Sequence, residues 1–267
     1  MASKLVSNSP EKYSEDKMVV IDSYEKLEKL PKNEQNYSHG VCICRVIKSL
    51  SSANPECFIP QFVGLGPYHH FRVELAINGE MKLGVANRVS KVRNLIPDDR
   101  DIFSKHLHDF VSDIHAFYHA DVTFTYDSRT RLYSLTIDGL FLLGLLHSSK
   151  SNLAGQYSDY YYFILTGRKQ RIPLLDTAGV EVTTDGIIRD IFMLENQIPT
   201  HVIRHLNRVN FNNSVDEIQS RDKDLGLAML NFYESLCPLL HLENLSKNPE
   251  AHDHLLDLMY HLIAPQP

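Results

Sequence analysis

The chain of 267 residues is 43% hydrophobic and 22% charged, with 33 acidic side chains against 27 lysines and arginines. This is a globular composition, and the length allows one large domain or two small ones. The net charge of −6 argues against nucleic-acid binding, which normally requires a basic excess. The longest apolar runs, 140–146 and 160–165, are far shorter than the roughly 20 residues that span a bilayer. We therefore expect no nucleic-acid partner and no membrane helix in this sequence.

Residues 1–38 are polar and charged, and they predict a flexible N-terminal arm that holds one helix at 16–30. The arm lacks the apolar stretch of about 7–15 residues that a secretory signal needs. The cysteines do not form the two spaced pairs that are typical of a structural zinc site. We expect a soluble, cytosolic chain with reduced core thiols at Cys42, Cys44, Cys57 and Cys237.

The first predicted elements of the remaining chain are short. Residues 41–46 are β-prone and predict a short strand, after which Pro55 and Pro60 favour an extended segment. Two glycines and a proline within 64–67 predict a loop. Apolar residues then recur at helical spacing over 101–120, and this is the clearest helix in the sequence.

The rest of the chain reads as mainly helical. A polar turn at 127–130 between β-prone residues 123–126 and 132–135 predicts a hairpin. Residues 137–146 are apolar on all sides, so a helix there would be buried. Further helices are predicted, in chain order, at 185–196, 199–206, 222–236 and 252–262. The expected fold is mainly α, or α+β at most: an irregular multi-helix domain with a few short strands or one hairpin.

Histidine is the main candidate for chemistry, because the common catalytic motifs are absent and the chain has 14 histidines. His108, His115 and His119 share the polar face of the helix predicted at 101–120. His115 and His119 are four residues apart, and His201 and His205 repeat that spacing. Each pair would need a third ligand for a catalytic zinc, so we favour solvated helix faces and predict no metal or cofactor.

Asp138 lies in an otherwise apolar run, 136–143. A buried carboxylate must be hydrogen-bonded or paired with a cation, because burial otherwise costs several kcal/mol. Asp138 is thus either a general acid or base with a raised pKa, or a structural group that holds backbone amides or an arginine. We favour the structural role.

The cluster Leu194–Pro199 is the second dense group of polar residues. Ile198 precedes a proline, so one helix has to end here and another begin. Asn196 suits a left-handed cap, and Glu195 and Gln197 can satisfy backbone groups at the corner. The alternative is that the carboxylate and the amide bind a ligand.

Six blocks follow one another in a fixed order: Cys44-Arg45-Val46, Asn54-Pro55 with Ile59-Pro60-Gln61, 64–70, 138–143, 190–199 and 254–258. Their order and spacing resemble the plant domain-of-unknown-function family number 247 from about residue 41 to the end. The positions that carry the motif, and that we expect to be structural, are Gly66, Pro67, Tyr68, His69, His70, Asp138, Gly139, Asp190, Glu195, Asn196, Gln197 and Pro199.

The resemblance implies a family without established enzymatic activity. Its members are typically longer, so residues 41–267 would be the N-terminal part of the domain, without the C-terminal half and its membrane-anchoring helix. Some grass members are regarded as pollen-side self-incompatibility determinants that recognise a small secreted stigma protein. By resemblance the full-length protein would be membrane-associated through that missing segment.

The sequence departs from the family pattern at three places. Leu140 stands where the family commonly has cysteine, and Gly144 where glutamate often follows the apolar run. The usual Met-Glu pair is blurred in 77–82. Without a second carboxylate at position 144, a two-acid catalytic site around Asp138 loses support.

The favoured function is non-catalytic recognition of a protein partner, with self- or hetero-oligomerisation as a further possibility. The polar loops at 156–162, 168–171 and 207–220 would then face the partner. Tyrosine and arginine dominate interface energetics, although a strand would place half of the tyrosines in the core. The candidate partner-binding residues are Tyr157, Tyr160, Tyr161, Tyr162, Arg168 and Arg171.

The alternative function is an uncharacterised hydrolase or a metal-dependent enzyme. It would use His69 or His70 with Asp138 or Glu195. These groups would have to converge on one pocket that solvent can reach.

Overall fold

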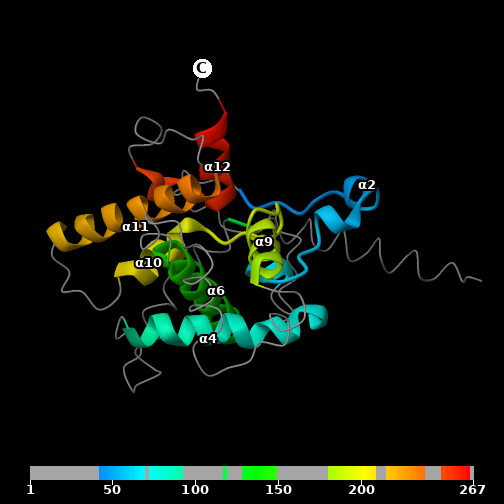
Figure 1. The fold of residues 1–267 in the computed structure, drawn as a ribbon, viewed down its shortest axis with the longest axis horizontal. Helices are drawn as coiled ribbons and strands as arrows, with labels where there is room; N and C mark the ends of the chain where they lie inside the picture. Colours follow the sequence, from blue (N-terminus) through cyan, green and yellow to red (C-terminus); the bar gives the residue numbers. More distant parts are fainter. Residues whose placement is uncertain are drawn as a thin grey trace, which may run out of the picture. The chain divides into compact units, whose positions relative to one another are not determined.

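A computed structural model describes residues 42–69, 72–92, 117–118, 128–148, 180–208, 215–237 and 248–264, all within one compact unit, 39–267 (Figure 1). This part of the chain is mainly α-helical, as predicted. Its α-helices are α2 (Lys48–Ser51), α3 (Gly66–His69), α4 (Ala76–Val92), α6 (Ser128–Ser148), α9 (Val180–Ile191), α10 (Thr200–Arg208), α11 (Val215–Leu236) and α12 (Leu255–Ile263). Short 3₁₀ turns lie at Pro55–Cys57, Val73–Leu75 and Pro249–Ala251.

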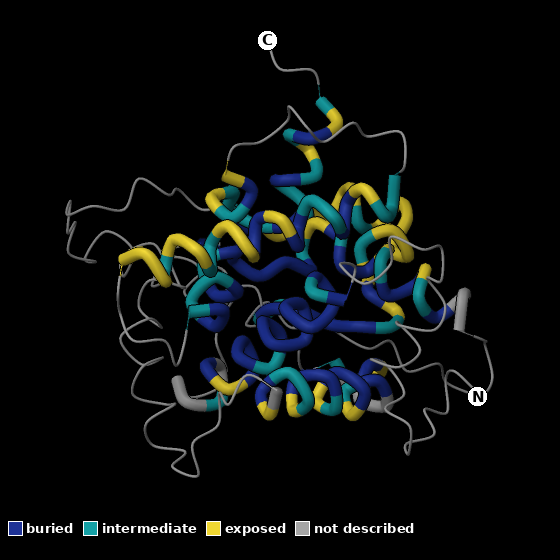
Figure 2. The backbone as a smooth tube through the Cα atoms, turned by 60° about the vertical axis from the view of Figure 1, so that its left-hand side comes forward, coloured by how far each residue is buried: buried dark blue, intermediate teal, exposed yellow. Residues whose placement is uncertain are grey.

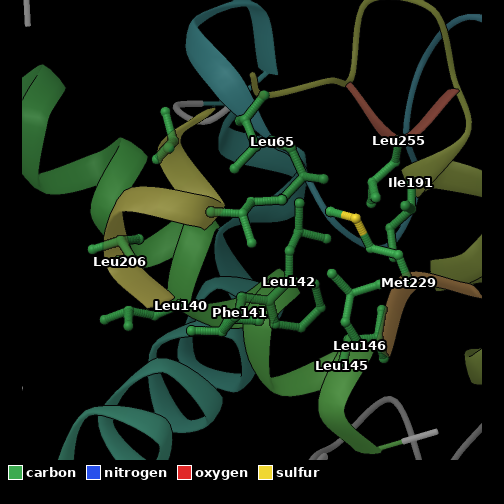
Figure 3. Close-up of a cluster of buried hydrophobic side chains, with 14 of the residues drawn as sticks. Leu65, Leu140, Phe141, Leu142, Leu145, Leu146, Ile191, Leu206, Met229 and Leu255 are labelled. Atoms are coloured by element: carbon green, nitrogen blue, oxygen red, sulfur yellow. The ribbon is translucent and has the colours of Figure 1, made fainter. Parts of the chain in front are cut away.

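Helix α6 forms the centre of the core and packs against α4, α10 and α11 (Figures 1 and 2). Its residues 140–146 are apolar or glycine and buried on every side, as expected for a helix without a polar face. Figure 3 shows Leu142 and Leu146 of this helix among apolar side chains from other elements, including Leu65 and Met229.

Gly144, at which the resemblance leads us to expect glutamate, lies where α6 and α4 approach closely. A Cβ atom at this position would lie 2.7 Å from Val89 Cγ2 and 3.0 Å from Val85 Cγ1, both on α4. A glutamate there would also bury a charge against an apolar helix face, at a cost of several kcal/mol. Within this chain, the glycine therefore fits the observed packing.

The predicted hairpin is wrong where the structure describes it. Residues 128–135 form the first two turns of α6, while 123–126 lie outside the described residues. Leu132 and Leu135 are buried three residues apart, so they extend the buried surface of the helix that follows. Burial along a continuous helix outweighs the β propensity of this short stretch.

The strand predicted at 41–46 is reduced to one isolated bridge between Ile43 and Tyr118, in which the amide of Ile43 donates to the carbonyl of Phe117 at 2.9 Å. Phe117 and Tyr118 are therefore not helical, so the predicted helix does not continue to residue 120. The rest of 101–120, with its three histidines, and the arm at 1–38 lie outside the described residues. The expected extended segment instead contains the 3₁₀ turn at Pro55–Cys57.

The prediction of core cysteines is wrong for Cys44 and Cys57, which are exposed in the surface segment 44–59. Cys42 and Cys237 are partly buried, and all four thiols are free. Burial raises the pKa of the Cys42 thiol to about 12. Cys42 is therefore a protonated, poorly nucleophilic thiol at neutral pH.

The later helices agree with the predictions in place and differ at their ends. Helix α9 spans Val180–Ile191 and ends before the polar corner at 192–199. Helix α10 begins directly after Pro199, as the missing amide of proline favours. Helix α11 begins at Val215, seven residues before the predicted start. None of the helices in the described ranges combines the length and the hydropathy that crossing a membrane requires.

Gly66 begins α3 with a φ of +64°, a conformation that non-glycine residues rarely adopt. A Cβ atom there would lie 2.5 Å from the backbone carbonyl oxygen of Gln197.

We expect Gly66→Ala to lower the free energy of unfolding by at least about 2 kcal/mol, as measured by urea denaturation. Gly79→Ala is the control: it lies inside α4 with nothing within 4 Å of the new Cβ, and it should stabilise by about 0.5–1 kcal/mol. Equal effects of the two substitutions would contradict this packing.

Candidate functional site

The motif residues converge on one short backbone stretch, residues 61–66, which we call the clamped segment. The buried carboxylate of Asp190, at the end of α9, is its first anchor. Asp190 Oδ2 accepts hydrogen bonds from the amides of Gln61 (2.8 Å), Phe62 (2.5 Å) and Val63 (3.0 Å). Arg189 Nη2 donates to the other oxygen at 3.0 Å. The charge of Asp190 is thus compensated by three backbone donors and one guanidinium.

Asn196 anchors the next residues of the clamped segment. Its Oδ1 accepts from the amide of Leu65 at 2.6 Å, and its Nδ2 donates to the carbonyl of Val63 at 2.8 Å. The same Nδ2 donates to the carbonyl of Asp190 at 2.8 Å. One fully buried amide therefore supplies the clamped segment with a donor and an acceptor, as a neighbouring strand would, and ties it to the end of α9.

Asp138 on α6 and Lys82 on α4 hold the end of the clamped segment. The amide of Gly66 donates to Asp138 Oδ2 at 2.9 Å, and Lys82 Nζ lies 2.5 Å from Asp138 Oδ1. Lys82 Nζ also donates to the carbonyl of Gly64 at 2.7 Å. Both side chains are buried, and an ion pair at this depth needs such additional hydrogen bonds to offset desolvation.

Gln197 connects the polar corner at 192–199 with α12. Its Nε2 donates to the carbonyl of Ile191 at the end of α9 (2.5 Å) and to that of Met193 (2.8 Å), which also accepts from the amide of Asn196 at 3.1 Å. Its Oε1 accepts from the amide of Leu256 at 3.3 Å. The backbone carbonyl of Gln197 accepts from the hydroxyl of Tyr118 at 3.0 Å. The amide group of Gln197 thus satisfies backbone atoms on both sides of the corner.

Glu195 and His69 form a further pair. Glu195 Oε1 accepts from the amide of Val46 at 2.6 Å, and its Oε2 lies 3.4 Å from His69 Nε2. The contact with the imidazole is not aligned as a hydrogen bond, and neither ring nitrogen of His69 has such a partner within the described residues. Burial, with the charges of Arg72 and Arg45, lowers the pKa of His69 to about 4. These effects outweigh the carboxylate, so His69 is neutral near pH 7.

The depressed pKa of His69 predicts a loss of stability in acid. The unfolded chain binds a proton at His69 below its ordinary pKa of 6.5, whereas the folded chain does so only near pH 4. Stability should therefore fall by about 3 kcal/mol between pH 6.5 and pH 4 on account of this group. His69→Gln should remove that part of the pH dependence of the urea midpoint. Identical pH profiles of the variant and the original protein would contradict the assignment.

The remaining motif residues complete the same region. Tyr68 packs edge-on against Tyr118, with ring centroids 5.8 Å apart, and its hydroxyl donates to the carbonyl of Ile43 at 3.4 Å. Pro67 lies in α3, and a Cβ atom on the buried Gly139 would lie 2.5 Å from the Leu206 side chain on α10. Pro199 is buried directly before α10, and His70 lies outside the described residues.

Other sequence-predicted candidates are not brought to the clamped segment. His201 Nδ1 pairs with Arg204 Nη2 at 2.9 Å on α10. His115 and His119 lie outside the described residues. So do all the predicted partner-binding residues: Tyr157, Tyr160, Tyr161, Tyr162, Arg168 and Arg171.

A small cavity of about 150 Å³ lies beside the clamped segment. Its lining consists of Phe62, Val63, Gly64, Leu75, Asn78, Gly79, Lys82, Leu83 and Ile137. Lys82 is the one charged side chain in this lining, and its ammonium group already bonds Asp138 and Gly64. Neither His69 nor Glu195 lines the cavity, and neither does Asp138.

The structure also assembles a cluster that sequence reasoning missed, formed by His252, Asp257 and His261. One ligand atom from each side chain lies within 4.8 Å of the others. The four-residue spacing of Asp257 and His261 on one helix is a signal that the sequence offers. The third member, His252, lies in the segment before the helix, and the conformation of residues 252–254 brings its side chain to Asp257.

Comparisons with known proteins agree with the resemblance found in the sequence. The family DUF247, described as "Plant protein of unknown function", matches residues 43–267. A UPF0481 protein of Arabidopsis thaliana is 28% identical over 232 residues, which cover 85% of this chain and 38% of that protein. The chain thus spans less than half the length of this curated relative. No solved structure matches.

Proposed function

Because this chain belongs to the DUF247 family of plant proteins, we propose that it is a non-catalytic recognition or signalling protein that acts by binding another protein. The observation that supports this proposal best is the bonding of the motif's polar side chains. Asp190, Asn196 and Asp138 each bind backbone groups of the clamped segment. Such side chains position a backbone and have little capacity left for a substrate.

The alternative function, a hydrolase or metal-dependent enzyme, would require a different arrangement of the motif residues. His69, Asp138 and Glu195 would have to face one solvent-reaching cavity. The cavity beside the clamped segment is lined by none of the three, and Asp138 and Glu195 each accept a backbone amide. A general base must instead reach a proton of the substrate. These contacts favour the recognition function.

The described surface offers apolar side chains of the kind that interfaces use. Leu194, Tyr260 and Ile263 are each more than half exposed. Single exposed apolar residues are ordinary, so these positions are secondary candidates beside the tyrosine and arginine group at 157–171. The partner class that the resemblance supplies is a small secreted protein, as for a pollen-side self-incompatibility determinant.

The proposal is tested by binding between the purified full chain and candidate small secreted plant proteins, measured by biolayer interferometry. We expect the double variant Arg168→Ala/Arg171→Ala to raise Kd at least about tenfold while leaving the urea midpoint unchanged. Lys223→Ala, an exposed cation on α11, is the matched control and should bind like the original chain.

Unchanged affinity of the double variant for a partner that does bind would remove the arginine pair from the interface. Turnover of a substrate that is abolished by Asp138→Asn, in a variant whose fold is intact by circular dichroism, would overturn the non-catalytic proposal itself.

A further inference from the structure

The geometry points to a zinc site on one side of α12, formed by His252, Asp257 and His261, which we call the α12 triad. His252 Nδ1 lies 3.0 Å from Asp257 Oδ2, and His261 Nδ1 lies 3.2 Å from Asp257 Oδ1. The two imidazole ring centroids are 4.8 Å apart. One carboxylate therefore lies between two imidazoles.

The backbone around the α12 triad explains why these side chains meet. Asp257 and His261 are one helical turn apart, so they share a face of α12. The segment before the helix is held by His254, whose Nδ1 accepts from the amide of Asp257 at 3.1 Å. The carbonyl of Asp253 accepts from the amide of Thr200 at 2.8 Å, which fixes the same segment to the start of α10. His252 is thus placed by a turn that is anchored on two helices.

Two imidazoles and one carboxylate are a donor set that binds zinc with a fourth position open to water. With bonds of 2.0–2.1 Å, neighbouring ligand atoms of a tetrahedral zinc ion lie about 3.3 Å apart. The two His–Asp separations, one to each oxygen of the Asp257 carboxylate, are close to that value. One ligand atom from each of the three side chains lies within 4.8 Å of the other two, so small side-chain rotations would bring all three onto one ion. The side chains of His252, Asp257 and His261 are 17%, 28% and 41% exposed, so water can occupy the fourth position.

A surface cluster of ion pairs is the competing explanation. His261 Nδ1 also lies 2.9 Å from the backbone carbonyl oxygen of Asp257, one helical turn earlier. This hydrogen bond within the helix would orient the imidazole without any metal ion. The amide of Asp253 reaches Asp257 Oδ2 at 3.3 Å as well. The experiment must therefore distinguish zinc binding at the triad from ion pairing alone and from zinc binding at other histidines.

The test is isothermal titration calorimetry, which measures the Kd for zinc when the full chain is titrated with ZnCl2 after a chelator has removed bound metal. We expect the chain to bind zinc, and Asp257→Asn and His261→Gln should each raise the Kd for zinc at least about tenfold. Even outer-shell substitutions at zinc sites lower metal affinity by about 10–100-fold. His252→Gln should have the same effect, and because it lies outside α12 it serves if a helix variant misfolds. Zinc should also raise the thermal midpoint of the original chain and not of these variants.

Two control variants separate the explanations. Asp253→Asn removes a neighbouring carboxylate outside the triad and should bind zinc like the original chain. The double variant His115→Gln/His119→Gln removes one of the two histidine pairs with four-residue spacing, and it should also leave this site intact. The proposal is overturned if the original chain binds no zinc, if folded triad variants bind as it does, or if binding is lost only in the His115→Gln/His119→Gln chain.

Discussion

Asp190→Ala is expected to lower the free energy of unfolding by about 4 kcal/mol. The substitution removes the acceptor of three backbone amides, those of Gln61, Phe62 and Val63, at 2.5–3.0 Å. Each buried donor left without a partner costs about 1–3 kcal/mol, and charge-assisted bonds are at the stronger end. Asp190→Asn keeps one carbonyl oxygen and should lose about half as much.

Urea denaturation followed by circular dichroism measures this loss. The matched control is Asp185→Ala, which removes an exposed carboxylate from the same helix and should change stability by less than about 0.5 kcal/mol. Similar losses in the two alanine variants would mean that the bonds from the clamped segment to Asp190 contribute no special stability.

Lys82→Met is expected to lower stability by about 4 kcal/mol, because it leaves the carboxylate of Asp138 buried without its cation. Adding Asp138→Asn should restore about 2 kcal/mol. The asparagine carries no charge and still offers an oxygen to the amide of Gly66. The double variant should thus be more stable than Lys82→Met, although Asp138→Asn alone should destabilise the original chain. Independent sites cannot give this change of sign.

The same denaturation experiment provides the test of this coupling. Lys91→Met removes an exposed cation from the same helix and should change stability by less than about 0.5 kcal/mol. If the losses of Lys82→Met and Asp138→Asn simply add, the buried ion pair is not the interaction that the two residues share.

The structure could be predicted best from the sequence at the places where a local pattern determines it. The uniformly apolar run that becomes the centre of α6 was expected to be buried, and it is. Asp138 stood out because a carboxylate in such a run needs a partner, and the corner before Pro199 followed from the restriction that proline places on Ile198. Each of these inferences rests on residues that are neighbours in the chain.

The clamped segment could not be predicted in the same way, because its bonds join distant residues. Asp190 lies 127 residues from Val63, and Lys82 lies 56 residues from Asp138. Lys82 and Asp190 each sit in a helix without any local feature that indicates a long-range partner. The wrong prediction of a hairpin strand at 132–135 has the opposite cause, since burial against the other helices outweighs a local β pattern.

Amide hydrogen exchange of the unmodified chain tests most directly the claim that the motif side chains fix the backbone. The amides of Val63, Leu65 and Gly66 donate to Asp190, Asn196 and Asp138. They should exchange as slowly as the amide of Leu143, which is fully buried in the centre of α6 and is expected to open only when the whole unit unfolds. Exchange at the rate of an unprotected, solvent-exposed amide would show that the clamped segment opens freely, and it would contradict the account.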